Sequence, residues 1–239
     1  MIYFVGAGSG APDLITVRGA RLLSEADVIV YAGSLVNPAL LEYKKDGCEV
    51  YNSAKMTLEE VIAVMAPAAK AGKTVVRLHT GDPCVYGAHR EQMDELDKRG
   101  LPYEVCPGVS SFCGAAAALK AEYTLPNVSQ SGRTPVPEKE QIEAFAAHGA
   151  TMVIFLSVGQ LPRLSERLIA GGYAPDTPAA IVYKATWPDE KVVRTTVGEL
   201  AAAGAREGIT KTALITVGGF LGTEYERSKL YDPTFTTEF

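Results

Sequence analysis

Several features that would point directly to a chemistry are missing from this sequence. It has four cysteines among 239 residues, and none of them has the C-x-x-C spacing of a zinc or redox site. We therefore predict scattered, reduced thiols and no metal site. No apolar run reaches the roughly 18 residues that a membrane helix needs, and the strand-like start, residues 1–5, is not a signal peptide. These absences predict a cytoplasmic protein that does not enter a membrane.

Positive charge is also scarce. The chain has 23 Lys and Arg against 28 Asp and Glu, which gives a net charge of −5, and it contains no long basic run. Non-specific binding of nucleic acid is therefore not expected. An acidic protein can still hold an anionic small molecule where a few cations converge. The candidates for that role are Arg77, His79, Arg90, Arg133, Lys184 and Arg194.

Strand and helix patterns alternate along the first half of the chain. Short apolar strands are predicted at 2–5, 27–31, 74–78 and 103–106, and helices at 16–24, 57–70, 88–98 and 111–119. Thr57 and Glu60 have the spacing of a capping box. The alternation predicts a mainly parallel sheet with helices on both faces, and the small-residue helix 111–119 is expected to pack tightly on it.

A segment rich in Pro, Ser and Gly, residues 125–137, interrupts this pattern and marks a domain boundary. We predict an N-terminal α/β domain at 1–124, a linker at 125–137 and a C-terminal α/β domain at 138–239. The second domain has strand patterns at 151–156, 179–183, 190–196 and 213–217, and helix patterns at 137–148 and 161–170. Val192 is the predicted inward-facing residue of the third of these strands.

The turn at 80–83, directly after the apolar strand 74–78, is the most informative part of the sequence. Open α/β folds bind their ligands at the carboxyl ends of the strands, where this turn must lie. Gly81 allows the main chain to approach a ligand, and Pro83 stiffens the turn. We interpret Asp82 as a carboxylate that bonds to backbone in the turn, rather than as an acid catalyst.

A glycine-rich turn, Gly6-Ala-Gly-Ser-Gly-Ala11, follows the first strand and formally fits the dinucleotide fingerprint. Pro12 and Asp13 interrupt the point where the helix of that motif begins. The second strand also ends in Tyr31-Ala-Gly-Ser, without the carboxylate that binds the ribose in that motif. A dinucleotide loop and a purely structural turn both stay open, but the residues favour a loop for another kind of ligand.

Four segments, in this order, resemble the tetrapyrrole (corrin/porphyrin) methylases, a family of S-adenosylmethionine-dependent enzymes. They are Gly6-Ala-Gly-Ser-Gly-Ala-Pro-Asp-Leu-Ile-Thr16, Tyr31-Ala-Gly-Ser-Leu-Val36, Gly81-Asp-Pro-Cys-Val-Tyr-Gly87 and Pro107-Gly-Val-Ser-Ser111. Three further segments, 132–138, 182–191 and 225–235, are similar to the branch that methylates C11 of precorrin-4 or cobalt-precorrin-4 in cobalamin biosynthesis. The resemblance runs essentially from end to end.

This resemblance implies two α/β domains, with a mainly parallel sheet in the first and a mixed sheet in the second. It also implies a homodimer, with S-adenosylmethionine in the cleft between the domains and S-adenosylhomocysteine as the product. Matching positions assign to the cofactor Pro12, Gly81, Asp82, Val85, Tyr86, Ser110, Ser111, Leu156, Tyr183, Ala185, Thr212 and Ala213. The other substrate is an anionic tetrapyrrole, for which we expect contacts from His79, Arg90, Arg133 and Lys184.

The sequence contains no Ser-His-Asp or Cys-His constellation, and this fits a methyl transfer. A sulfonium methyl group is already activated, so holding an electron-rich ring carbon in line with it can lower the barrier by about 7–11 kcal/mol. We therefore name no general base. His79 and Tyr86 have structural alternatives as buried side chains, and Trp187 is expected to be a packed anchor of its turn.

Two departures from the family pattern bear on the substrate. Ala32 and Gly33 stand where the uroporphyrinogen methylases carry an Asp after the Tyr, which counts against that substrate. Only Val128-Ser-Gln-Ser131 precedes Gly132, where related chains have a longer strand, so the role of the linker with Arg133 stays open. The alternatives are a methylase of the same fold with another acceptor, such as another precorrin position, ribosomal RNA or modified histidine, and a non-enzymatic nucleotide sensor.

Overall fold

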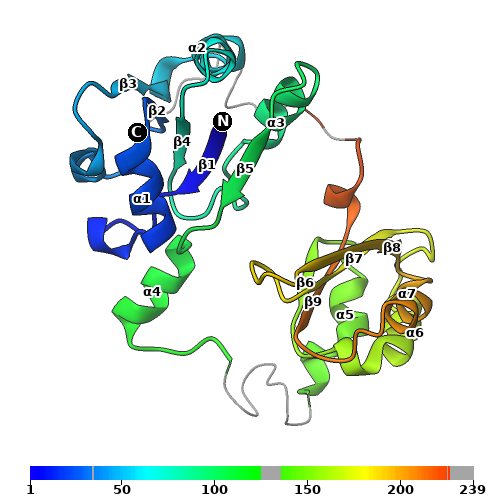
Figure 1. The fold of residues 1–239 in the computed structure, drawn as a ribbon. Coiled ribbons are helices and arrows are strands. Elements are labelled where there is room, and N and C mark those ends of the chain that lie inside the picture. The colour runs from blue at the N-terminus through cyan, green and yellow to red at the C-terminus, as the bar shows by residue number, and fades with distance from the viewer. Residues whose placement is uncertain (34, 125–135, 225, 227–239) are drawn as a thin grey trace. The chain divides into compact units, whose positions relative to one another are not determined.

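The computed structural model describes residues 1–33, 35–124, 136–224 and 226. The described chain divides into two compact units, one at 1–121 and the other at 122–226, and each is considered by itself (Figure 1). The predicted linker at 125–137 and the tail segment 225–235 lie almost entirely outside the described residues. The predicted domain boundaries therefore stay predictions.

The first unit contains a five-stranded parallel sheet in the order β3-β2-β4-β1-β5. All five residues of the central strand β4 are buried, which is typical of a parallel sheet covered on both faces. The edge strand β3 is largely exposed and was not predicted, because it lacks an apolar run. The strands are β1 (Ile2–Gly6), β2 (Val28–Tyr31), β3 (Glu49–Asn52), β4 (Val75–His79) and β5 (Tyr103–Cys106).

Helices cover both faces of this sheet, as predicted. Helix α1 (Val17–Glu25) packs its leucines against one face, while α2 (Leu58–Lys70) and α3 (Arg90–Asp97) cover the other. The capping box is confirmed, because Thr57 and Glu60 exchange side-chain-to-backbone hydrogen bonds of 3.2 and 2.8 Å. Short 3-10 helices stand at Pro12–Leu14 (η1), Pro38–Tyr43 (η2) and Ser53–Lys55 (η3).

Helix α4 (Ser111–Leu119) has the predicted bounds but not the predicted packing. No side chain of this described helix is buried, and Phe112 and Leu119 are exposed. The expectation of tight packing rested on the small side chains, which allow a close approach but do not bury enough apolar area to enforce one. Gly114 does make a close approach, since a Cβ there would lie 2.9 Å from the Cβ of Ser9.

The second unit contains a four-stranded sheet in the order β6-β9-β7-β8, and all its neighbouring strands are antiparallel. The predicted α/β fold class is confirmed, but the mixed pairing within this sheet is a correction. Strands β6 and β7 run in the same direction through the crossover helix α6, yet β9 lies between them, so no parallel pair forms. The strands are β6 (Met152–Ile154), β7 (Pro178–Tyr183), β8 (Lys191–Thr196) and β9 (Ala213–Val217).

Three helices, α5 (Ile142–Ala146), α6 (Leu161–Ala170) and α7 (Leu200–Arg206), pack on one face of this sheet around Ile181 and Ile215. The predicted helix at 137–148 is divided into η4 (Glu138–Glu140) and α5, and α7 was not predicted. Two further 3-10 helices are η5 (Val158–Gln160) and η6 (Gly219–Leu221).

The inward residue predicted for β8 was wrong by one position. Val193 pairs with Ile181 and packs against the core, whereas Val192 is 57% exposed on the opposite face. Both residues are valines, so the alternation of side chains could not tell the two faces apart.

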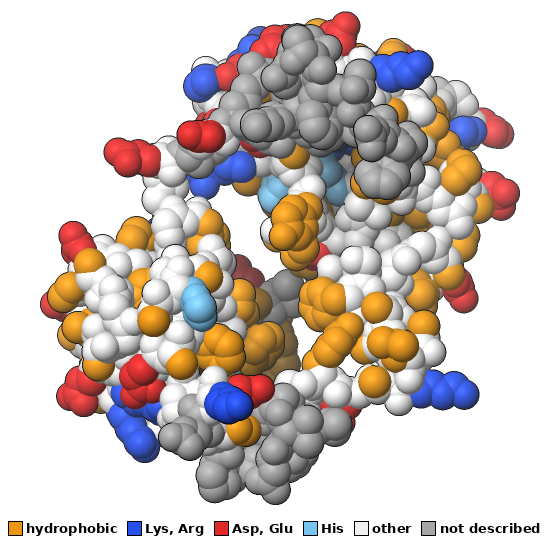
Figure 2. All heavy atoms as spheres, turned by 180° about the vertical axis from the view of Figure 1, so that it is seen from behind, with side chains coloured by type: hydrophobic (Ala, Val, Ile, Leu, Met, Phe, Trp, Pro, Cys, Tyr) orange, Lys and Arg blue, Asp and Glu red, His pale blue; other side chains and the backbone are white. Residues whose placement is uncertain are grey.

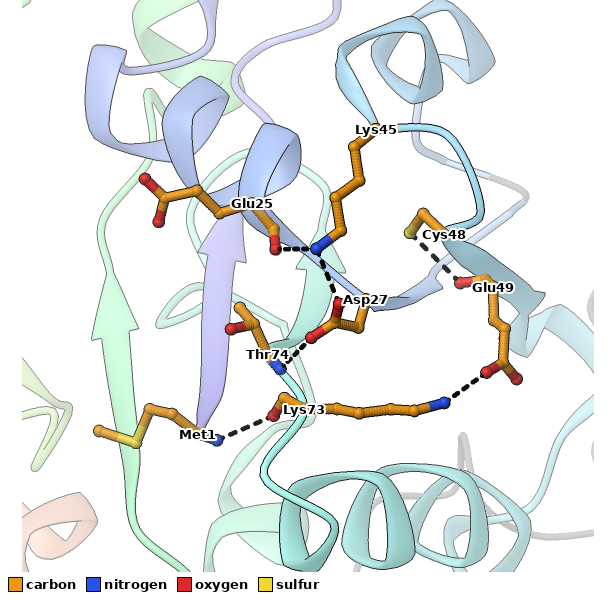
Figure 3. A network of polar contacts seen from close by, with 8 residues as sticks. All are labelled: Met1, Glu25, Asp27, Lys45, Cys48, Glu49, Lys73 and Thr74. Carbon is orange, nitrogen blue, oxygen red and sulfur yellow. Dashed lines mark hydrogen bonds and ion pairs between the residues drawn. The ribbon is translucent and has the colours of Figure 1, made fainter.

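A polar network closes the amino edge of the parallel sheet (Figure 3). The Asp27 carboxylate accepts hydrogen bonds of 2.7 Å from both the Lys45 ammonium and the backbone N–H of Thr74. The N-terminal amine of Met1 donates to the carbonyl of Lys73, whose own ammonium lies 2.7 Å from Glu49. The starts of four strands are thus tied together, and the opposite, carboxyl edge is the one where open α/β sheets bind ligands.

The two valines of β8 provide a matched test of this fold. We expect Val193→Ala to lower the free energy of unfolding by about 1 kcal/mol, because it removes side-chain volume packed against the core. Val192→Ala makes the same change in strand propensity at an exposed position, so it should lower the free energy of unfolding by much less. Chemical denaturation of both variants measures the difference, and equal losses would contradict the assigned register.

Candidate functional site

The loops that follow β1 and β4 are joined by backbone hydrogen bonds at the carboxyl edge of the parallel sheet. The N–H of Ala7 donates to the carbonyl of His79 at 2.7 Å. Beyond it, Gly8 and Gly81 exchange two backbone hydrogen bonds, of 3.2 and 2.9 Å, in an isolated antiparallel bridge. The glycine-rich turn and the Gly-Asp-Pro turn therefore form one backbone surface.

The loop after β5 touches the same surface because glycine stands at each contact. A Cβ on Gly108 would lie 2.2 Å from the carbonyl oxygen of Gly81, and a Cβ on Gly6 would lie 2.5 Å from the Cα of Gly108. No side chain fits at either position. At Gly81 itself a Cβ would have room, at 3.5 Å from its nearest neighbour, but its φ of +56° favours glycine.

Asp82 joins two of these loops through its carboxylate. One oxygen accepts from the N–H of Cys84 at 2.8 Å, and the other accepts from the N–H of Gly108 at 2.9 Å. This geometry confirms the interpretation of Asp82 as a backbone-bonding carboxylate. It fixes the distance between the Gly-Asp-Pro turn and the turn before α4.

The thiol beside this carboxylate is not a nucleophile at neutral pH. Burial, and after it the charge of Asp82, raise the pKa of Cys84 to about 11. Reactive cysteines have lowered pKa values, because the thiolate is the reacting form. The loop therefore presents backbone groups rather than a reactive side chain.

The remaining residues assigned to the cofactor in the first unit stand on these same loops. Val85 and Tyr86 continue the Gly-Asp-Pro turn and are exposed, Tyr86 fully, so Tyr86 is not a core aromatic. Ser110 is the N-cap of α4, and Ser111 is its first residue. A Cβ added to Gly81 would lie 3.5 Å from the backbone nitrogen of Ser111, so these serines lie next to the Gly-Asp-Pro turn. Pro12 begins η1, which directly follows the glycine-rich turn.

His79 lies beneath this loop surface rather than on it. Its side chain is 3% exposed, and its ring centroid is 6.0 Å from those of both Phe4 and His89. Burial first, and then the nearby Arg77, lower the pKa of His79 well below its ordinary value, so the ring is neutral. Arg77 is also buried and donates to Gln92 and to the carbonyl of Val30. His79 is therefore not a cation, and both candidates lie inside the first unit rather than on the loop surface.

A second edge of main chain lies at one end of the sheet in the second unit. Because β9 runs opposite to β6 and β7, the ends of those two strands and the start of β9 share this edge. Tyr183 pairs with Ala213, and the N–H of Lys184 donates to the carbonyl of Thr212 at 2.9 Å. Tyr183, Thr212 and Ala213 are thereby brought together, with Ala185 next along the chain.

Residues in the left-handed backbone region concentrate at these positions. Leu156, Lys184 and Thr212 have φ values of 57°, 47° and 55°, and Tyr86 on the other edge has 56°. They are four of seven non-glycine residues with positive φ in the described chain. This conformation costs roughly 1–2 kcal/mol per residue, and such strain gathers at binding sites. The sequence gives no signal for it, since none of the four is glycine, asparagine or aspartate.

The other described cationic candidates have local partners: Arg90 and Lys184, which were assigned to the tetrapyrrole, and Arg194, which was a candidate for an anionic ligand in general. The Arg90 side chain lies 3.0 Å from Asp94, and Arg194 donates to the carbonyl of Leu221. Lys184 lies 2.6 Å from Asp189, while Arg133 is outside the described residues. Trp187 is 58% exposed, so its predicted role as a packed anchor is wrong.

Metal sites and membrane-spanning helices are both missing from the described residues. In the described part of the chain, no group of three His, Cys, Asp or Glu side chains is placed to hold a metal ion. Nor does any described helix combine the length and apolar character required to cross a bilayer. On the face of the molecule in Figure 2, basic side chains stand singly among acidic ones.

Comparison with known proteins identifies close relatives along the whole chain. The sequence model of the Tetrapyrrole (Corrin/Porphyrin) Methylases matches residues 1–201. The chain is 54% identical to the cobalt-precorrin-4 C(11)-methyltransferase of Methanocaldococcus jannaschii, over all of this chain and 95% of that one. It is 45% identical to the precorrin-4 C(11)-methyltransferase of Sinorhizobium sp, over 100% and 97% of the two chains.

Two solved structures are also similar. An X-ray structure of a cobalt precorrin-4 methyltransferase is 47% identical, with a TM-score of 0.54 over 93% of this chain and 96% of that chain. A uroporphyrin-III-C-methyltransferase from Thermus thermophilus is 32% identical, with a TM-score of 0.50 over 92% of each chain.

The buried, neutral His79 predicts a pH dependence of stability. Its folded pKa is lowered, so its contribution is complete above the unfolded value of about 6.5 and is lost as the pH falls below that value toward the folded pKa. We expect His79→Gln to flatten the decline of unfolding free energy between about pH 7 and pH 5. Denaturation at a series of pH values measures the slope. His148→Gln, at an exposed histidine, is the control, and an equal flattening in it would contradict this account.

Proposed function

The chain belongs to the tetrapyrrole (corrin/porphyrin) methylases, and from this premise we propose that it methylates C11 of a precorrin-4-type macrocycle with S-adenosylmethionine as donor. The observation that carries the proposal is the identity of 54% and 45%, from end to end, with relatives named for that reaction. The identity with the uroporphyrin-III methylase is lower, at 32%. Ala32 also stands where we expected an Asp in methylases of that substrate.

The residues at the two strand edges fit a donor of this kind. An adenosine and a methionine moiety need backbone donors and acceptors, apolar contacts and little bulk near the reacting methyl group. The first unit offers the glycine-lined surface around Gly81 with exposed Val85 and Tyr86. The second offers Leu156, Tyr183, Ala185, Thr212 and Ala213, of which Leu156 and Thr212 have left-handed backbones, a strain that clusters at ligand-binding sites.

These residues bind and orient, and none of them needs to transfer a proton. The donor supplies a methyl group already activated by its sulfonium sulfur. The Asp82 carboxylate holds the Gly81 and Gly108 loops at a fixed separation, so the backbone that faces the donor is arranged before binding. Positioning of this kind can lower the barrier by about 7–11 kcal/mol.

The acceptor carries several carboxylates around an apolar ring, which is why we assign cations to its recognition. Any cobalt belongs to the macrocycle and is part of the substrate. The described basic side chains that Figure 2 shows are scattered rather than gathered in one patch, which argues against RNA, the alternative acceptor. We also propose a homodimer in the cytoplasm, and size-exclusion chromatography with light scattering tests the dimer.

The proposal is tested in two steps, because donor and acceptor are separable. Calorimetric titration with S-adenosylhomocysteine should show binding of one molecule per chain. Incubation with S-adenosylmethionine and either cobalt-precorrin-4 or precorrin-4 should give a product heavier by one methyl group, with uroporphyrinogen III as the comparison acceptor. Absence of S-adenosylhomocysteine binding by folded protein would refute the donor, and methylation of uroporphyrinogen III alone would refute the acceptor.

The strained backbone at Leu156 predicts that a substitution there can weaken the binding of S-adenosylhomocysteine without lowering the stability of the protein. Leu156→Gly relieves roughly 1–2 kcal/mol of left-handed strain, against an added chain entropy of about 0.5–1 kcal/mol, and loses little burial because Leu156 is exposed. Stability should stay equal or rise slightly. The dissociation constant for S-adenosylhomocysteine should rise about tenfold, because the apolar contact is lost.

Lys120→Gly is the matched control for this variant. Lys120 also has a positive φ, of 51°, at the C-cap of α4, and it is not assigned to the donor. Its replacement should change stability in the same direction and leave donor binding unaltered. A Leu156→Gly protein that binds S-adenosylhomocysteine as tightly as the wild type would remove Leu156 from the site.

A further inference from the structure

The turn that joins β7 to β8, residues 184–190, has a defined shape. The N–H of Trp187 donates to the carbonyl of Lys184 at 3.0 Å, and the N–H of Glu190 donates to the carbonyl of Trp187 at 3.1 Å. The N–H of Thr186 donates to the Glu190 carboxylate at 2.5 Å. Two of its residues, Lys184 and Thr186, have left-handed backbones, with φ of 47° and 69°. The chain therefore holds this turn in one strained conformation.

At this turn, the Lys184 ammonium lies close to two aromatic rings. The Nζ of Lys184 is 5.2 Å from the ring centroids of both Tyr183 and Trp187, which is within the range of cation–π attraction. Asp189 accepts from the same ammonium at 2.6 Å. Hydrogen bonds with Asp189, and then with Tyr183, raise the pKa of Lys184, so the ammonium is charged at neutral pH. Its side chain is only 23% exposed.

Stability does not account for this arrangement. Trp187 leaves 58% of its surface exposed instead of packing into the core, although it is the only tryptophan of the chain. The Asp189 carboxylate of the ion pair is 57% exposed, and an ion pair with one partner open to water contributes little to folding. The two left-handed residues are unfavourable in themselves. A cation fixed beside an exposed aromatic face is instead suited to a ligand that is both apolar and anionic.

We propose that this turn recognises the tetrapyrrole, with the exposed face of Trp187 against the macrocycle and the Lys184 ammonium on one of its peripheral carboxylates. The assignment rests on the proposed function for its choice of ligand. An ammonium has three N–H donors, so Lys184 can bind a carboxylate of the ligand while it keeps its bond to Asp189. The contacts with the two rings and with Asp189 reduce the freedom of the lysine before binding, which lowers the entropy lost on recognition.

The position of the turn supports this assignment. The backbone of Lys184 is bonded to Thr212, and Tyr183 pairs with Ala213, so the turn begins at the edge proposed for the donor. An acceptor held by the side chains of Lys184 and Trp187 therefore lies next to residues that hold the donor. No general base is required of the turn, and its residues act by positioning and by selecting an anionic ring.

Steady-state kinetics with cobalt-precorrin-4 separates this role from a structural one. Lys184→Met and Trp187→Ala should each raise KM for the tetrapyrrole about tenfold or more, as charge-assisted hydrogen bonds and aromatic stacking do elsewhere. The dissociation constant for S-adenosylhomocysteine should not change. Trp187→Phe should recover much of the affinity, because it restores an aromatic face. Lys191→Met, which removes the next lysine along the chain, should leave KM as in the wild type.

The single tryptophan allows a direct measurement of contact. Acrylamide quenches an exposed indole by collision, so bound cobalt-precorrin-4 should lower the quenching constant of Trp187, and S-adenosylhomocysteine alone should not. The quenching constant is divided by the fluorescence lifetime measured in the same sample, because a coloured macrocycle shortens the lifetime of tryptophan by energy transfer even from a distance. This measurement needs binding but no turnover, so it decides the proposal even if methylation fails.

The outcomes distinguish the two proposals. If Lys184→Met and Trp187→Ala keep the KM of the wild type, or if the macrocycle binds without protecting Trp187, the role of the turn is refuted while the proposed activity stands. If the wild type binds S-adenosylhomocysteine but neither binds nor methylates any tetrapyrrole, both are refuted. A rise in KM with matched weakening of donor binding would indicate a structural defect and would also overturn the assignment.

Discussion

The contact between bare main chains at the carboxyl edge of the parallel sheet is the constraint on which the first half of the candidate site depends. Gly6 and Gly108 meet where no side chain could be placed, and the carbonyl of Gly81 fills the remaining space. Three loops from three strands thereby become one surface of backbone donors and acceptors. Everything proposed for the methyl donor in this unit follows from that close approach.

Both proposed edges present main chain in uncommon conformations and few reactive groups. The Cys84 thiol is protonated at neutral pH, and the His79 ring is buried and neutral. The described residues at these edges can bind and orient a ligand, and they offer few groups for covalent or acid–base catalysis. This is expected when the donor molecule carries the reactive group and the protein has only to bind and orient it.

The sequence was sufficient for features that depend on local pattern. Apolar strands, the Thr57 capping box and the bond from Cys84 to Asp82 were all predictable, because each depends on residues close together in the chain, whereas the bond from Gly108 to Asp82 joins residues 26 apart and was not. The order β6-β9-β7 was not, since it depends on where a late strand inserts between two earlier ones. The facing of Val192 and Val193 was ambiguous for a simpler reason, as two identical residues carry no alternation. Within the site, the strain at Leu156 and Lys184 had no signal, because ordinary side chains occupy a conformation that usually needs glycine.

The carboxylate of Asp82 has a consequence for the chemistry that this position tolerates. One oxygen accepts a hydrogen bond from the loop after β4, and the other accepts one from the loop after β5. The side chain must therefore offer a lone pair at both of its terminal atoms. An amide of the same shape would turn an NH₂ group toward one of those N–H groups, and one attraction would become a repulsion. The symmetry of an ionised carboxylate, and not merely its size or polarity, is therefore what keeps these two loops in register.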